Sequence, residues 1–147
     1  MGSSKIIMLS GIYLIFGFYI KSYNNVDEAV YKISLKSATM AQAEQLAETG
    51  ITLAKSYLGG SAANTFGPKT FISGNDTVQY SASSLGVASP SQTMVTSTAS
   101  HYTTVMVAGS PTVKVVRRVV QTALMQYHNA RWKQIRIYTT RNYQDTF

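Results

Sequence analysis

The fold of this chain is decided by one uncharged stretch, Ile6-Ile7-Met8-Leu9-Ser10-Gly11-Ile12-Tyr13-Leu14-Ile15-Phe16-Gly17-Phe18-Tyr19-Ile20. Helical spacing of apolar residues continues from it to Leu58 without a proline. At roughly 1.5 Å per residue, residues 6–58 predict one helix about 80 Å long. Because a helix that is apolar on all sides needs apolar surroundings, we expect residues 1–22 to lie in a membrane or in the packed core of a polymer. The candidate core residues are Ile6, Ile7, Leu9, Ile12, Leu14, Ile15, Phe16, Phe18 and Ile20.

Two lysines, Lys5 and Lys21, bracket this stretch. Its fifteen uncharged residues correspond to roughly 22 Å of helix, which is short against about 30 Å of bilayer hydrocarbon. The alternative is a secretory signal peptide that is removed. No small-x-small cleavage site follows Ile20, and helical spacing resumes at once, so the sequence favours a retained segment.

Residues 23–60 form an amphipathic half with a different pattern. Apolar residues recur there every three or four positions, which predicts one stripe along a helix. Gly59-Gly60 is typical of a helix end. Spacing near 3.6 and small residues favour packing on a sheet over a coiled-coil dimer. The predicted helix–sheet contacts are Val30, Ile33, Met40, Ala43, Ala47, Ile51, Ala54 and Leu58.

Residues 61–147 predict an antiparallel sheet. After a predicted loop over 61–74 with Gly67-Pro68, short turns are expected at 109–111 and 127–130. Strict alternation over Arg131 to Thr140 puts Trp132, Gln134, Arg136 and Tyr138 on one face of the last strand. The fold class is therefore α+β, a long N-terminal helix packed on a roughly four-stranded antiparallel sheet. The predicted strands are Thr77–Ser83, Thr93–Ala108, Thr112–Gln126 and Arg131–Thr140.

Charge is spread unevenly along the chain, whose net charge is +7. Residues 114–141 hold seven cations and no acid, whereas four of the six acids lie in the predicted helix. In a polymer, such opposed charges would meet between neighbouring subunits, and solubility alone is the alternative reading. The absence of cysteine excludes disulfides, zinc–thiolate sites and thiol catalysis.

The sequence carries no motif for catalysis, metal binding or cofactor binding. There is no HExxH, phosphate-binding Gly-rich loop or nucleophile elbow, and His101 and His128 are expected to be a strand and a turn residue. We therefore predict that the protein is not an enzyme and has no cofactor. One basic and aromatic surface is a candidate for nucleic-acid binding, because rings stack on bases while cations hold phosphates. Packing of this strand is favoured over that alternative. The surface comprises Arg131, Trp132, Lys133, Arg136, Tyr138 and Arg141.

The layout of apolar helix, amphipathic stalk and antiparallel sheet resembles the type IV pilin-like family. The run from Ala43 to Ala54 is similar to the Ala-x-x-Leu-Ala-Glu-x-Gly-Ile-x-x-Ala stretch of PilX-type minor pilins. The run from Val95 to Ala99 and the strand from Val113 to Leu124 are similar to paired strands of that group. These pilins carry a glutamate at the fifth mature position, whereas the fifth residue here is Lys5, or Ile7 if cleavage follows Gly2. The usual inter-subunit salt bridge at that position is accordingly not expected here.

The resemblance implies a structural subunit of an extracellular filament at the cell surface. Its partners would be copies of itself, the inner membrane before assembly, and a pilus assembly machinery. One alternative is a minor pilin or pseudopilin of a pilus or secretion system. Another, of a different class, is a membrane-anchored binding module that never polymerises.

Overall fold

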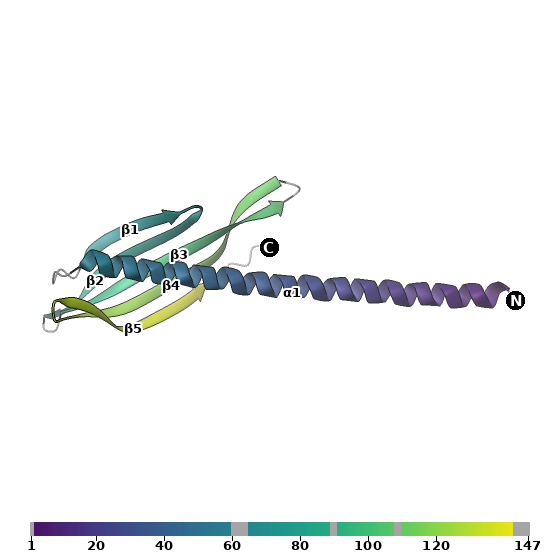
Figure 1. The fold of residues 1–147 in the computed structure, drawn as a ribbon, viewed down its shortest axis with the longest axis horizontal. Coiled ribbons are helices and arrows are strands. Elements are labelled where there is room, and N and C mark those ends of the chain that lie inside the picture. Colours follow the sequence, from purple (N-terminus) through teal and green to yellow (C-terminus); the bar gives the residue numbers. More distant parts are fainter. Residues whose placement is uncertain (1, 60–64, 89–90, 108–109, 143–147) are drawn as a thin grey trace. The chain divides into compact units, whose positions relative to one another are not determined.

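The computed structural model describes residues 2–59, 65–88, 91–107 and 110–142, and the side chains of 10–27, 29–59, 65–86, 91–104 and 117–142. One helix is followed by five strands (Figure 1). The α+β class is confirmed, whereas the expected number of strands was one too low. The elements are α1 (Gly2–Leu58), β1 (Phe66–Ser73), β2 (Asp76–Ala88), β3 (Ser91–Val107), β4 (Ser110–His128) and β5 (Arg131–Asn142).

The chain divides into two compact units, and the boundary between them lies within α1. The N-terminal unit is Met1–Ala38 and the sheet unit is Thr39–Phe147. The last turns of α1 from Thr39 onward therefore belong with the sheet, and the predicted apolar core segment belongs to the N-terminal unit.

The sheet is a meander in which every strand pairs antiparallel with its neighbours in the sequence. The turn between β4 and β5 consists of Asn129 and Ala130, which both have positive φ (51° and 59°). Two such residues in succession are typical of a two-residue hairpin turn that matches the twist of the strands. The four-residue turn expected over 127–130 is thus two residues shorter, because Tyr127 and His128 still pair with β5.

β1 is the strand that the sequence analysis assigned to a loop. It lies at the edge of the sheet, and its pairing with β2 shifts register between Phe66 and Lys69, at Gly67-Pro68. Proline has no N–H to donate to a ladder, so it is tolerated at edge strands and bulges. The dipeptide that read as a loop signal is therefore the irregular part of an edge strand.

One face of the sheet is covered by the C-terminal part of α1 (Figure 1). On β3, buried residues alternate with half-buried ones, as expected for a strand with one covered face. Two clusters join helix and sheet across this interface. The first contains Ile51, Ala54, Leu58, Ala82, Val95, Ala123, Met125 and Trp132, and the second contains Met40, Ala43, Ala47, Val78, Ala99 and Val119.

Small residues let α1 lie close to the sheet. Ala43, Ala47 and Ala54 are completely buried, and their partners in the clusters include Ala99 and Ala123. Gly50 is also buried, where α1 closely approaches Val78 of β2 and Ser97 of β3. These short side chains allow the backbone of the helix to approach the strands closely.

Candidate interaction surfaces

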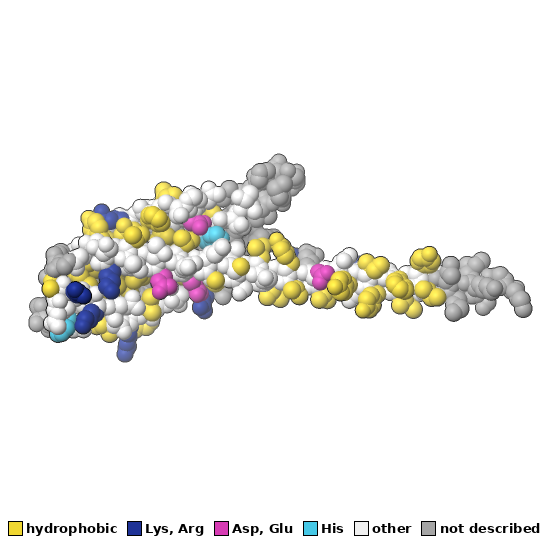
Figure 2. Space-filling view, viewed as in Figure 1, with side chains coloured by type: hydrophobic (Ala, Val, Ile, Leu, Met, Phe, Trp, Pro, Cys, Tyr) yellow, Lys and Arg dark blue, Asp and Glu magenta, His cyan; other side chains and the backbone are white. Residues whose placement is uncertain are grey.

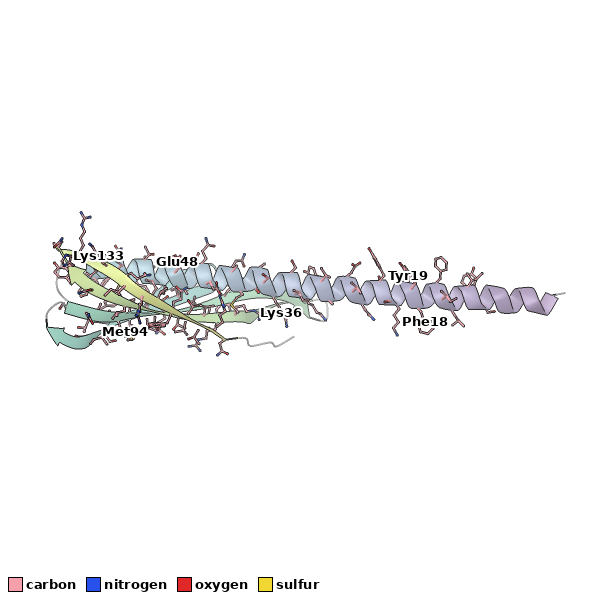
Figure 3. The ribbon with its side chains drawn as sticks, turned by 90° about the horizontal axis from the view of Figure 1, so that it is seen from below. Phe18, Tyr19, Lys36, Glu48, Met94 and Lys133 are labelled. Atoms are coloured by element: carbon pink, nitrogen blue, oxygen red, sulfur yellow. The ribbon has the colours of Figure 1, made fainter. Side chains whose placement is uncertain are left out.

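The N-terminal unit presents an apolar helix segment, which we define as residues 12–20 of α1. Its eight large hydrophobic side chains are 45–73% exposed. Phe18 and Tyr19 point to opposite sides of the helix (Figure 3), and hydrophobic side chains are visible along this part of α1 (Figure 2). A helix that is hydrophobic on all sides is normally buried. The exposed side chains of this segment therefore mark an interaction surface.

Most predicted core residues lie in this segment. Ile12, Leu14, Ile15, Phe16, Phe18 and Ile20 are all exposed. Ile6, Ile7 and Leu9 lie in the helix, but their side chains are outside the described set. By length and mean hydropathy, no helix among the described residues qualifies as a membrane span.

The predicted helix–sheet stripe divides at the boundary between the two units. Met40, Ala43, Ala47, Ile51, Ala54 and Leu58 belong to the clusters shared with the sheet. Val30 and Ile33, in the N-terminal unit, are instead 60% and 68% exposed. These two residues therefore add to the exposed apolar surface of that unit.

The structure does not bring the basic and aromatic candidates together as one surface. Trp132 is only 2% exposed, and its ring packs 5.2 Å from that of Tyr127 in the core. Arg141 forms an ion pair with Glu44 of α1. The buried indole is thus a core residue and has no free face on which a base could stack.

A bulge in β5 also places Trp132 on one face of the sheet and Arg136 and Tyr138 on the other. Leu124 pairs with Arg136 and Met125 pairs with Gln134, so Ile135 is the extra residue. After it, Arg136 and Tyr138 lie on the face opposite Trp132. The expectation that Trp132, Arg136 and Tyr138 share one face was wrong for this reason. A side-chain hydrogen bond with Tyr138 raises the pKa of Arg136 above its ordinary value.

A basic groove lies where α1 ends against the β4–β5 turn. We define it by its lining residues, and its volume is about 640 Å³. Three of them, Lys55, Arg131 and Lys133, are exposed cations. Lys133 is seen at that end of the sheet unit in Figure 3, and Lys and Arg side chains gather there in Figure 2. The lining residues are Thr52, Lys55, Ser56, Gly59, Ala130, Arg131, Trp132 and Lys133.

Local chemistry explains how the sequence builds this groove. Gly59 has φ 59° and its N–H donates to the carbonyl of Lys55 at 3.2 Å, which ends the helix with a left-handed cap. The two-residue turn at Asn129 and Ala130 then places Arg131 and Lys133 on either side of the buried Trp132. The sequence analysis named Arg131 and Lys133 but missed Lys55, because only the fold brings the helix end to the hairpin.

A second polar cluster, centred on Asp76, was also missed. Its carboxylate lies 3.0 Å from Nδ1 of His101 and accepts a hydrogen bond of 2.8 Å from the backbone N–H of Tyr102. The fully buried Arg117 pairs with His101 across β3 and β4. Within the described part of the chain, no three His, Asp and Glu side chains are grouped to hold a metal ion. The hydrogen bonds of Asp76 therefore link β2 to β3.

Comparison with known proteins adds no assignment to these surfaces. No protein-family model, curated protein or solved structure matches the chain.

Proposed function

We propose that this chain is a structural subunit of an extracellular, type IV pilus-like filament that polymerises through its N-terminal helix. One observation carries the proposal: the apolar helix segment is exposed around the helix rather than along one stripe. A single-sided partner, such as a coiled-coil helix, would cover only part of such a surface. Enclosure on all sides, as in the core of a helical polymer, would cover the whole.

The free energy gained by burying these side chains favours enclosure over a one-sided contact. The segment holds six Ile, Leu and Phe side chains. Complete burial of one such side chain contributes about 1.5–3 kcal/mol, so six offer on the order of 10 kcal/mol. Losing translational and rotational freedom on association costs an estimated ~4–15 kcal/mol. A contact that buries half of these side chains would contribute about 5 kcal/mol, near the lower end of that cost, whereas full enclosure would contribute about twice as much.

The proposal includes the route to the filament. Before assembly, residues 6–20, which include this segment, would lie in the inner membrane between Lys5 and Lys21. An assembly machinery would then transfer it to the filament core, and the sheet unit would form the outer layer at the cell surface. No catalytic step or cofactor is part of this function.

A charge-insertion experiment tests the proposal. Two lysines at Leu14→Lys and Phe18→Lys, one helical turn apart, should abolish filaments in material sheared from the cells. The matched control is Ser34→Lys with Ala38→Lys, which has the same spacing at exposed positions of the same helix. Filaments should persist in the control, because added charge at solvent-exposed positions changes stability little.

The readout is electron cryomicroscopy of the sheared fraction, with the chain identified from side-chain density. Filaments made by the Leu14→Lys, Phe18→Lys double variant would refute assembly through this segment. A chain of low abundance in the wild-type filament would indicate the minor pilin or pseudopilin role. A wild-type chain that stays in the membrane fraction and forms no filament would indicate the anchored binding module.

A further inference from the structure

We propose that the basic groove binds the adjacent carboxylates Asp27 and Glu28 of a second copy of this chain. The inference rests on the proposed filament, and it names the surface by which the sheet unit of one subunit meets the helix of another. Both surfaces are present on every copy, so the contact is head-to-tail and repeats along a polymer.

The described lining residues of the groove carry a net positive charge. Its lining residues include three cations and no acid. The end of α1 adds a partial negative charge of about half an elementary charge. That offsets only a part of about three unit charges, so roughly two and a half positive charges remain. Ser56 and Thr52 add hydroxyl groups at the wall. This combination favours a ligand with two negative charges and several acceptor oxygens.

Few acids in the chain are available as that ligand. Glu44 is paired with Arg141, and Asp76 is held by His101 and the N–H of Tyr102. Glu48 is a single carboxylate, and Asp145 lies outside the described residues. Asp27 and Glu28 are the only two acids adjacent in the sequence. They place two negative charges within one turn of α1.

Both acids lie in the N-terminal unit, directly after the segment that is proposed to enter the polymer core. Asp27 is exposed. In the sequence, Lys32 follows Glu28 by four positions, and an exposed pair at such spacing contributes only about 0.3–0.5 kcal/mol. An intrahelical ion pair of that strength would not prevent the carboxylates from binding the three cations of the groove. Charge pairing of this kind sets partner orientation and register more than overall affinity.

The absence of cysteine allows a clean cross-linking test in the full-length chain. One population carries Asp27→Cys and a second carries Lys133→Cys, so that a bond between the two sites must join different copies. Both populations are mixed during assembly, and sheared filaments are treated with a short bis-maleimide. The matched control replaces Lys133→Cys with Thr70→Cys, an exposed site on the opposite edge strand β1. We expect a dimer band from the first mixture and little from the control.

Charge exchange supplies the second arm. Lys133→Glu should lower filament yield roughly five-fold by placing like charges together, and Asp27→Lys combined with Lys133→Glu should restore it. Filaments assembled from the mixed Asp27→Cys and Lys133→Cys chains that show no more linkage than the Thr70→Cys control would overturn this inference and leave the helix-driven filament intact. The same holds if position 133 links to a different protein. A failure of wild-type chains to form any filament would overturn the proposed function first and this contact with it.

Discussion

Gly50 faces Ser97 so closely that a methyl group at Gly50 would lie 2.1 Å from Ser97 Oγ. The same methyl group would lie 2.6 Å from Cγ1 of Val78, so both β2 and β3 close the space above the helix. Only a residue without a side chain fits this point of contact between α1 and the sheet.

Gly50→Ala should therefore destabilise the sheet unit. Overpacking of this kind costs about 1–3 kcal/mol, and the better helix propensity of alanine returns up to ~1 kcal/mol. Fluorescence of Trp132, the single tryptophan of the chain, follows the unfolding in urea. The control is Gly17→Ala in the same helix, where no atom lies within 4 Å. An equal effect of both substitutions would contradict the close approach.

Trp132→Ala should be among the most damaging substitutions in the sheet unit. The indole is buried in the core cluster with Ile51, Leu58 and Met125, and truncating such a ring costs about 3–5 kcal/mol. Tyr138→Ala, at an exposed position of the same strand, should change the free energy of unfolding by at most ~0.5 kcal/mol. Circular dichroism in urea provides the comparison. Similar values for the two variants would show that the indole does not lie in the core.

The ion pair between Glu44 and Arg141 should contribute little to stability. Both side chains are partly exposed, and double-mutant cycles of such pairs give about 0.2–1 kcal/mol. We expect a coupling energy in this range from Glu44→Gln and Arg141→Gln, measured singly and together. The coupling should fall further in 1 M salt, where screening acts within about 3 Å. A coupling that rises with salt would rule out an electrostatic contact.

Asp76 should tolerate asparagine better than alanine. Asparagine keeps an oxygen that can accept the hydrogen bond from the N–H of Tyr102, whereas alanine leaves that half-buried donor without its partner. Loss of such a bond costs about 1–3 kcal/mol. Thermal unfolding of Asp76→Asn and Asp76→Ala tests the order. Equal melting temperatures would mean that the hydrogen bond to Tyr102 makes no net contribution.

Periodicity was enough to predict the helix, its buried stripe after Met40 and the antiparallel order of the last three strands. It failed at β1 because Gly67-Pro68, a reliable loop signal in most contexts, is also what an edge strand tolerates. It failed within β5 because a single unpaired residue, Ile135, reverses which face each later side chain occupies. Alternation in a sequence carries no sign of such an insertion.

The basic groove lay beyond sequence reasoning for another reason. Lys55 and Lys133 are far apart in the chain, and only Lys133 belongs to the basic and aromatic surface predicted from the sequence. Their proximity depends on the helix ending at Gly59 and on the two-residue turn before Arg131. The Gly59-Gly60 pair predicted where the helix ends. No local pattern predicted that the turn between β4 and β5 lies beside that end.

The two edges of the meander have a consequence for how the protein behaves when it is concentrated. An open sheet edge is a template on which another chain can add a strand, and uncontrolled addition leads to aggregates. Here β1 carries Pro68 and a register shift, and the outer strand β5 carries Arg131, Lys133, Arg136 and Arg141. Both devices discourage edge-to-edge growth. Copies can therefore accumulate side by side without extending one another's sheets, and self-association is left to surfaces other than the strand edges.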